Sequence, residues 1–444
     1  MKKKIAVIGA GAAGCFCAIQ LKRLRPECEV DVYEGGARAL AKVAVTGGGR
    51  CNLTNTFRDV RSLKEVYPRG EQVMKRAFHT FDNCRLMQWF EDEGVRLTVQ
   101  DDQCVFPQSQ DAMQIVRTLL RGMDEAGVRL HLRHKVSSVS ECHKEAPLSG
   151  GVRECVSESI RECVGEDVNE KVSEGATESV SEGYVITFAD GNLPSVQADV
   201  VIVTTGGSPR QSGLDFLRPL QMEMASPVPS LFSFCIPGTS DLMGVTVDEV
   251  SVALAGTKFR STGTLLITHW GMSGPAILKL SSQAARHLAE CGYTAQLVVN
   301  WLGGKTEDEV RAEIKAMQLA QGARQVGNTH LQQLPARLWQ VLLQRAGISA
   351  GVRWREVGQK QLNRFAAVLS ADVWPVQGQN RHKEEFVTCG GVALSNVNLS
   401  TLEAKSHPGL YFAGEVLDVD AVTGGFNLQA AWSMAYVVAK AVIL

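Results

Sequence analysis

The chain of 444 residues has almost no net charge and no long apolar run. Its formal charge at pH 7 is -1, so no global electrostatic field indicates a nucleic acid or an acidic membrane as partner. The longest apolar stretch, residues 430–444, is interrupted by Lys440 and is shorter than the roughly 20 residues that a membrane-spanning helix needs. We therefore expect no membrane association and no nucleic-acid partner.

Metal-binding cysteine patterns are also missing, although the chain contains 12 cysteines. Cys15 and Cys17 are separated by one residue and Cys389 stands alone, so the paired spacing of a zinc site does not occur. In a chain of this size, such cysteines are typical of the reduced thiols of a cytoplasmic protein. The expectation is a cytoplasmic protein that holds no metal.

Glycine is abundant, and the first glycine cluster, GAGAAG at residues 9–14, follows an apolar stretch at residues 5–8 that predicts a buried strand. Gly9 permits a tight turn, Gly11 lets the backbone approach a pyrophosphate, and Gly14 lets the following helix pack close to the strand. This spacing between a strand and a helix predicts the first half of a Rossmann-type nucleotide-binding domain.

The residues around this fingerprint add to the prediction. Ala12 and Ala13 open the helix, whose N-terminus offers unpaired N–H groups to phosphates. Glu34 follows 20 residues after Gly14, at the end of a second predicted strand, where its carboxylate can accept hydrogen bonds from ribose hydroxyls. The ligand predicted here is a dinucleotide, and both FAD and NAD remain open at this point.

A second glycine cluster lies at residues 46–52, TGGGRCN. Three successive glycines (Gly47, Gly48 and Gly49) expose the backbone, so this loop can approach a flat or anionic ligand closely. Arg50 could pair with a phosphate or polarise a flavin carbonyl. The alternative for the loop taken alone is a glycine-rich turn with a surface arginine.

The C-terminal part contains a second anchor for a ligand. A predicted strand at residues 410–414 ends in Gly414 and is followed by Glu415, whose carboxylate suits the hydroxyls of a ribityl chain. The turn of Thr423, Gly424 and Gly425 then points the N-terminus of the last helix at an electron-rich group, as the flavin N1/C2=O edge is. A nicotinamide needs no such second anchor, so the pair of anchors favours FAD.

Between two predicted hairpin strands, residues 129–139 and 183–190, the chain carries four successive octads at residues 152–183. They contain nine acidic and three basic residues, and the four-residue apolar period builds no lasting helical stripe. We interpret the insertion at 141–183 as a surface excursion from the hairpin loop. An acidic tether for a partner protein is the alternative.

The remaining pattern outlines the domains. Helical periodicity occurs at residues 73–93, 307–321 and 336–369. After about residue 209 the apolar residues mostly alternate, a pattern that predicts strands. The fold class predicted is α/β, with an FAD-binding domain made of residues 1–208 and 386–444. Residues 209–385 are predicted to be an inserted substrate or cap domain.

Several motifs together give the chain a family resemblance. They are the fingerprint, TGGGRCNLTN at 46–55, VFPQS at 105–109, THWGMSGPAIL at 268–278, TCGGV at 388–392 and GLYFAGEVLDVDAVTGGFNLQAA at 409–431. With them the chain resembles the bacterial flavoproteins described as NAD(P)/FAD-dependent or aminoacetone-oxidase-like, which include bile-acid dehydro-reductase-like proteins. The resemblance implies an FAD domain split by an insert with β-barrel-like and helical parts.

The resemblance also implies a set of cofactor contacts. Lining residues carried over from the family are Lys42, Thr46, Gly47, Gly48, Gly49, Arg50, Cys51, Asn52, Thr205, Gly206, Glu415, Thr423, Gly424, Gly425, Asn427 and Leu428. Val136 is expected to give backbone hydrogen bonds to adenine. Two features depart from the family: Ala421 stands where a glycine is usual, and the octads have no counterpart.

The chemistry follows from the flavin, with Cys51, Cys389 and His269 as candidate catalytic residues. The two cysteines do not form a CxxC pair, so small packing residues near the flavin are the alternative, and His269 is either a proton donor or structural.

The chain has no second nucleotide fingerprint, so NAD(P)H would bind only transiently in the substrate cleft. We predict an FAD-dependent oxidoreductase acting on a small organic substrate with NAD(P)H or oxygen. The alternatives are a redox sensor that binds a partner and a flavin-dependent enzyme that modifies nucleic acid.

Overall fold

The computed structural model describes residues 2–142, 183–208, 210–380 and 387–442, so most of the octad repeat lies outside the described residues. Five parallel strands form the central sheet, in the order β19-β10-β1-β2-β6. Their bounds are β1 (Lys4–Ile8), β2 (Glu29–Glu34), β6 (Arg129–Leu132), β10 (Val200–Val203) and β19 (Leu410–Phe412). Two of the inner strands, β1 and β10, are almost wholly apolar because both faces of the sheet are covered there.

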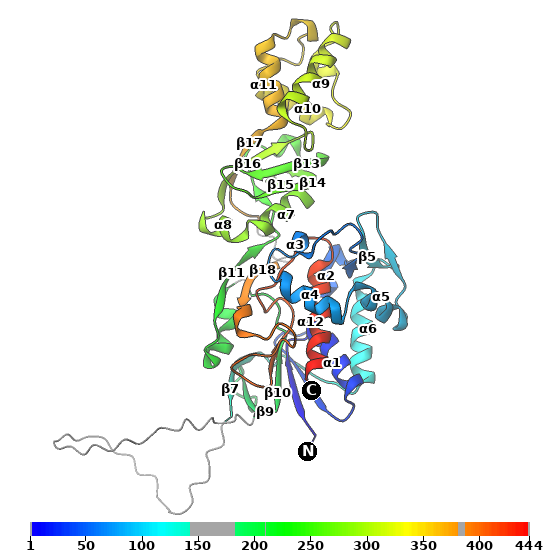
Figure 1. The fold of residues 1–444 in the computed structure, drawn as a ribbon, viewed down its shortest axis with the longest axis vertical. Helices are drawn as coiled ribbons and strands as arrows, with labels where there is room; N and C mark the ends of the chain where they lie inside the picture. Colours follow the sequence, from blue (N-terminus) through cyan, green and yellow to red (C-terminus); the bar gives the residue numbers. More distant parts are fainter. Residues whose placement is uncertain (1, 143–182, 209, 381–386, 443–444) are drawn as a thin grey trace, which may run out of the picture.

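Helices cover one face of this sheet. The C-terminal helix α12 packs against α1, and α6 packs against α1 from the other side (Figure 1). The helices of this part are α1 (Ala12–Leu24), α2 (Ala41–Gly49), α3 (Leu63–Val66), α4 (Glu71–Thr80), α5 (Asn83–Asp92), α6 (Ala112–Glu125) and α12 (Phe426–Ala441). Residues 73–93, expected as one helical stretch, form two helices because Asp82 caps a new helix by accepting a hydrogen bond from the Arg85 N–H.

Two small antiparallel sheets complete this part. One is β3 (Thr54–Asn55), β5 (Cys104–Pro107) and β4 (Leu97–Val99), and the other is β7 (Val136–Glu141), β8 (Tyr184–Phe188) and β9 (Val196–Ala198). The predicted hairpin around the octads is correct for β7 and β8. Residues 129–132 do not belong to it, because β6 pairs with β2 in the central sheet instead.

The inserted part is connected through an antiparallel pair, β11 (Met224–Ser230) with β18 (Val387–Val392). Beyond it lies a six-stranded antiparallel sheet of β12 (Phe234–Cys235), β15 (Gly271–Ser273), β14 (Arg260–Thr268), β13 (Thr246–Leu254), β16 (Thr294–Asn300) and β17 (Asp372–Gln377). The sheet curls until its two edges meet, since Phe234 bridges Gln379 just after β17. The β-barrel-like insert implied by the resemblance is therefore confirmed.

The longer helices of the insert lie at the end of the molecule opposite the chain termini, whereas the two shorter ones lie near the β11–β18 connection (Figure 1). The helices are α7 (Pro275–Gln283), α8 (Ala285–Glu290), α9 (Glu307–Ala320), α10 (Ala336–Arg345) and α11 (Gln359–Ser370). We call α9, α10, α11 and the segments between them the helical arm. Residues 336–369, expected to be helical throughout, are split into α10 and α11 after Gly347, whose φ of +74° ends the first helix.

Two separate apolar cores follow this organisation. One surrounds the central sheet and α12, and the other fills the insert around Trp301, Trp339 and Trp354. The 3-10 helix Gln211–Leu220 packs into the first core. The domain limits at 208/209 and 385/386 stay predictions. None of the helices that the structure describes is long and apolar enough to cross a membrane.

Candidate cofactor cleft

A cavity of about 470 Å³ opens at the carboxyl ends of β1, β2, β10 and β19. Its lining comes from residues 9–13, 34–52, 204–206 and 413–431, with Leu231 and Val387 added from the segments that lead into and out of the insert. Ligands bind at this edge of open parallel sheets because successive loops diverge there and leave a crevice. The cavity therefore lies where the sequence predicts the dinucleotide.

The glycines of the fingerprint are each required for a different reason. Gly9 has a φ of +104°, and a Cβ on it would lie 2.7 Å from the Thr204 carbonyl oxygen. A Cβ on Gly14 would lie 1.9 Å from the Gly9 carbonyl oxygen, so only glycine lets α1 pack this close to the strand. Gly11 has no such neighbour nearer than 4.0 Å and lines the cavity. This geometry agrees with the roles predicted for the three glycines: a tight turn at Gly9, an open approach to the ligand at Gly11 and close helix packing at Gly14.

The adenosine end of the cleft is marked by Glu34 at the end of β2. Its two carboxylate oxygens accept hydrogen bonds from the backbone N–H groups of Ala10 (2.9 Å) and Gly36 (2.7 Å). A carboxylate has about four acceptor positions, so it can accept further bonds from ribose hydroxyls. Arg38 also lines the cavity here, a residue that the sequence motifs did not single out. Val136, expected beside adenine, is not among the lining residues.

The loop at 46–52 is divided between the cavity and the surface. Thr46, Gly47 and Asn52 line the cavity, whereas Gly48, Gly49 and Arg50 do not. The Arg50 guanidinium instead lies 4.7 Å from the centre of the Phe106 ring, a cation–π contact. The surface-arginine alternative therefore describes Arg50 in this structure, while the glycines give the turn its left-handed backbone.

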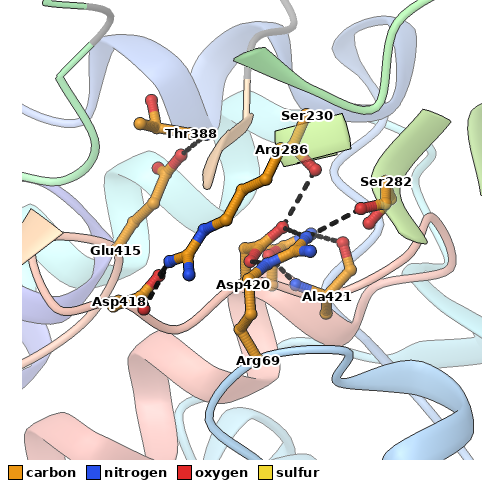
Figure 2. A network of polar contacts seen from close by, with 10 residues as sticks. Arg69, Ser230, Ser282, Arg286, Thr388, Glu415, Asp418, Asp420 and Ala421 are labelled. Atoms are coloured by element: carbon orange, nitrogen blue, oxygen red, sulfur yellow. Dashed lines mark hydrogen bonds and ion pairs between the residues drawn. The ribbon is translucent and has the colours of Figure 1, made fainter. Parts of the chain in front are cut away.

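Glu415 is fixed beside the cavity by backbone and charge. Its Oε1 accepts a hydrogen bond from the Thr388 N–H at 2.6 Å (Figure 2), and its Oε2 lies 3.8 Å from the Lys42 ammonium. Glu415, Lys42, Thr205 and Gly206 all line the cavity. The carboxylate thus stands at the opposite end of the cleft from Glu34, as the two-anchor interpretation requires.

The turn before α12 is held by side chains that reach backward along the chain. Asn427 accepts from the Ala421 N–H at 2.8 Å and donates to the Ala421 carbonyl at 3.0 Å. Ala421 has no positive φ, so the alanine at this position costs no backbone strain. Asn52, with its amide oriented to satisfy both groups, bonds the Thr54 carbonyl at 3.0 Å and the Gly425 N–H at 3.1 Å. The glycine loop and the C-terminal turn are therefore tied together.

The cavity offers the groups that a flavin dinucleotide needs. The N-termini of α1 and α12 have no side-chain cap, and Ala12, Ala13, Asn427 and Leu428 at these ends line the cavity. Uncapped helix N-termini attract negative charge, which a pyrophosphate and the N1/C2=O edge of a flavin both carry. With a carboxylate at each end for ribose and ribityl hydroxyls, the donor and acceptor set fits FAD.

The three candidate catalytic residues are not brought together. Cys51 is fully buried behind the glycine loop, and burial raises the pKa of its thiol to about 12. Cys389 on β18 is also buried, and burial raises the pKa of its thiol too. His269 lies exposed in the turn between β14 and β15, away from the cavity lining. A thiolate nucleophile at either cysteine is not favoured by these surroundings, and the catalytic role of all three stays a prediction.

A buried ion pair joins the two parts of the molecule, and sequence reasoning missed its basic partner. Arg69 forms a two-pronged ion pair with Asp420, and its guanidinium also donates to the Ser282 carbonyl of the insert at 2.9 Å (Figure 2). Ser230 of β11 donates to Asp420 at 2.9 Å. Burial raises the pKa of Asp420, and the facing guanidinium opposes that rise.

A second pair runs parallel to the first. Arg286 of the insert donates two hydrogen bonds to Asp418, at 2.7 and 2.9 Å. The two aspartates of the C-terminal motif, Asp418 and Asp420, thus hold the insert against the cofactor domain. Among the residues that the structure describes, no group of histidines, cysteines and carboxylates is arranged to hold a metal ion.

The split parallel sheet and its two-anchored cavity are those of a flavin-binding Rossmann protein. More narrowly, the chain belongs to the HI0933-like family, because the family model "HI0933-like protein Rossmann domain" matches residues 3–441. The predicted family resemblance and the FAD-binding α/β fold are therefore confirmed, as is the prediction of an FAD-dependent oxidoreductase.

Curated relatives cover the whole chain. A ribosomal RNA dihydrouridine synthase from Escherichia coli K12 is 29% identical over 464 residues, covering 98% of this chain and 97% of that protein. A 3-dehydro-bile acid delta(4,6)-reductase from Clostridium scindens is 25% identical over 461 residues, covering 99% of this chain and 98% of that protein. Among solved structures, a mutant of E. coli quinol fumarate reductase FrdA has a TM-score of 0.46 at 15% identity, with 100% of this chain and 70% of that chain covered.

Proposed function

We propose that the chain is a flavin-dependent reductase whose substrate is a uridine in ribosomal RNA. The observation that supports this proposal is the similarity to ribosomal RNA dihydrouridine synthase, which extends over both the cofactor part and the insert. The second relative is named as a reductase of a 3-dehydro bile acid. Uracil and a conjugated steroid ketone share one chemical feature, a carbon–carbon double bond next to a carbonyl, and hydrogen is added across that bond.

A bound flavin supplies hydride transfer for such a reduction. The residues of this chain hold and orient it: Glu34 and Glu415 anchor its two sugar-like parts. The uncapped N-terminus of α12 favours the negative charge that grows at the N1/C2=O edge during reduction. NAD(P)H is the reductant that we propose, bound transiently because the chain has one fingerprint only.

The expectation that excluded nucleic acid rested on the net charge of -1, and that argument does not hold. Residues 143–182 contain ten acidic and four basic residues, so they contribute -6, and the rest of the chain carries +5. A single net charge therefore averages an acidic segment with a basic remainder. Non-specific attraction to RNA depends on local positive charge rather than on this average.

The test is a reduction assay with the FAD-loaded protein, protein-free ribosomal RNA and either NADPH or NADH under anaerobic conditions. Digestion to nucleosides and mass spectrometry then measure dihydrouridine. We expect dihydrouridine to accumulate with time and only with the reductant present. The second candidate function, favoured by the bile-acid relative, is reduction of a small conjugated ketone. Turnover of a 3-oxo steroid diene together with no dihydrouridine would replace the first proposal by the second.

A further inference from the structure

The part of the helical arm that follows α9 carries an unbalanced concentration of positive charge. Residues 321–371 contain seven arginines and lysines and one acidic residue, Glu356. Two of the seven are occupied elsewhere: Arg345 pairs with Asp372, and Arg337 donates to backbone carbonyls near β13. The five others are exposed, and we call the surface formed by Arg324, Arg353, Arg355, Lys360 and Arg364 the basic arm surface.

Backbone pairing brings three of these cations together from segments that are far apart in sequence. Gln325 bridges Arg353 in antiparallel orientation, the Trp354 N–H donates to the Arg324 carbonyl at 3.0 Å, and the Arg355 N–H donates to the Gly322 carbonyl at 3.1 Å. Trp354 between the two arginines is fully buried, whereas Arg353 and Arg355 on either side of it are exposed. The tryptophan therefore fixes the strip that carries the charges.

The two remaining cations continue the surface along α11. Lys360 lies in the first turn of this helix, which begins three residues after Glu356, and Arg364 follows four residues later on the same face. The exposed residues between them are amides rather than acids, Gln361 and Asn363. Amide side chains are common partners of phosphate and sugar in protein complexes with nucleic acids.

The basic arm surface includes one carboxylate, that of Glu356, which accepts a hydrogen bond from the Arg353 backbone N–H at 3.2 Å. None of its five cations forms an ion pair with any residue that the structure describes. Three of the four acids of α9 are ion-paired within their own segment, since Arg311 binds Glu307 and Asp308, and Lys305 binds Glu313. The fourth, Glu309, accepts hydrogen bonds from Thr306 at the helix cap. Five unpaired cations on one small unit are energetically unfavourable by mutual repulsion, and a polyanion relieves that repulsion.

We infer that the basic arm surface binds the phosphate backbone of structured RNA, and this inference rests on the proposed function. The arm lies at the end of the molecule opposite the chain termini, away from α1 and α12 beside the cofactor cleft (Figure 1). Its RNA contacts are therefore distant from the base that is reduced. The arm recognises the shape and charge of the surrounding RNA, while the cleft receives the target base.

The test compares charge variants of the FAD-loaded full chain by fluorescence anisotropy with a fluorescein-labelled RNA hairpin. The variant Arg324→Gln/Arg353→Gln/Arg355→Gln removes three charges from the arm. The matched control, Lys2→Gln/Lys3→Gln/Lys440→Gln, removes three exposed charges near the chain termini at the other end of the molecule. Flavin content and melting temperature verify that both variants are folded.

We expect the arm variant to bind the hairpin at least about ten-fold more weakly at about 0.1 M salt. The slope of log K against log salt should become shallower by roughly 2 to 3, because three phosphate contacts are lost. The control should bind as the wild type does. The variant Arg324→Lys/Arg353→Lys/Arg355→Lys should recover most of the affinity, because it restores the charge.

The outcomes for the inference and for the proposed function can be told apart. If the wild type forms dihydrouridine in ribosomal RNA and the arm variant binds and reacts equally well, the basic arm surface is not the RNA site and the proposed function stands. If the arm variant loses RNA binding while the wild type forms no dihydrouridine, the RNA site stands and the proposed reaction is wrong. A wild type that does not bind the hairpin overturns the inference.

Discussion

Replacing Gly14 or Gly11 by alanine separates packing of the fingerprint from binding of the cofactor. An alanine Cβ at position 14 would lie 1.9 Å from the Gly9 carbonyl oxygen, whereas Cβ atoms essentially never come within 3.0 Å of another heavy atom. The N-terminus of α1 must therefore move by more than 1 Å away from the sheet. At position 11 the same Cβ meets nothing nearer than 4.0 Å, and it extends toward the cavity.

The magnitudes follow from these distances. Overpacking costs about 1–3 kcal/mol, and the better helix propensity of alanine returns about 1 kcal/mol. Because the atoms that clash belong to the backbone and cannot rotate away, we expect Gly14→Ala to lose about 2 kcal/mol or more of the free energy of unfolding. Gly11→Ala should lose only about 0.5 kcal/mol, since glycine is a slightly better N-cap than alanine.

The assay combines urea unfolding of the flavin-free protein with FAD titration followed by flavin fluorescence. We expect Gly11→Ala to unfold almost as the wild type does but to bind FAD at least ten-fold more weakly, a difference of about 1.4 kcal/mol. Gly14→Ala should show the opposite pattern, with a larger loss in the free energy of unfolding than in the free energy of FAD binding. Wild-type FAD affinity in Gly11→Ala, or wild-type stability in Gly14→Ala, would refute the assignment of these two roles.

Three further predictions concern charge and thiols. Asp420→Asn leaves a buried guanidinium unpaired and should lower the free energy of unfolding in urea by about 3–5 kcal/mol. Asp418→Asn, whose partner arginine is half exposed, should lower it by about 1 kcal/mol or less. Equal losses would show that burial does not decide the effect. Burial opposes ionisation of Asp31, but hydrogen bonds from an arginine and a histidine lower its pKa. The wild type should therefore have a free energy of unfolding roughly 1 kcal/mol higher than that of Asp31→Asn at neutral pH, and this difference should disappear as the pH falls below about 4. A constant difference down to pH 2 would contradict the lowered pKa. Iodoacetamide at pH 7.5, with peptide mass spectrometry, should label exposed Cys84 while buried Cys51, with a pKa of about 12, stays unmodified until unfolding. Labelling of both at one rate would contradict the protection of the Cys51 thiol by burial.

Much of the cofactor site could be predicted because its geometry is local. Gly9, Gly11 and Gly14 each answer a requirement of one turn, and the same holds for Gly424 and Gly425 before α12. Glu415 follows a strand directly, so its position at the edge of the sheet is set by the strand itself. Short-range constraints of this kind leave a recognisable spacing in the sequence.

Contacts between distant segments left no such signal. Arg69 and Asp420 form an ion pair although 351 positions separate them in the sequence. No local motif around either residue predicts this contact. Arg50, at the end of α2, contacts the ring of Phe106, which belongs to β5 and lies 56 positions further along the sequence. Residues 73–93 and 336–369 each kept one periodicity, yet the Asp82 cap divided the first stretch into two helices and the left-handed Gly347 divided the second.

The sequence by itself was enough to predict two anchors for a flavin dinucleotide, because each predicted anchor is a turn that only certain residues can form. The tertiary structure decided how charge is distributed, because a formal sum of -1 contains no information about distance. Pairing of residues 322–325 with 353–355 gathers three arginines that form no ion pair with any residue that the structure describes. Electrostatic attraction depends on separation and screening, so the basic arm surface became visible only when the chain was folded.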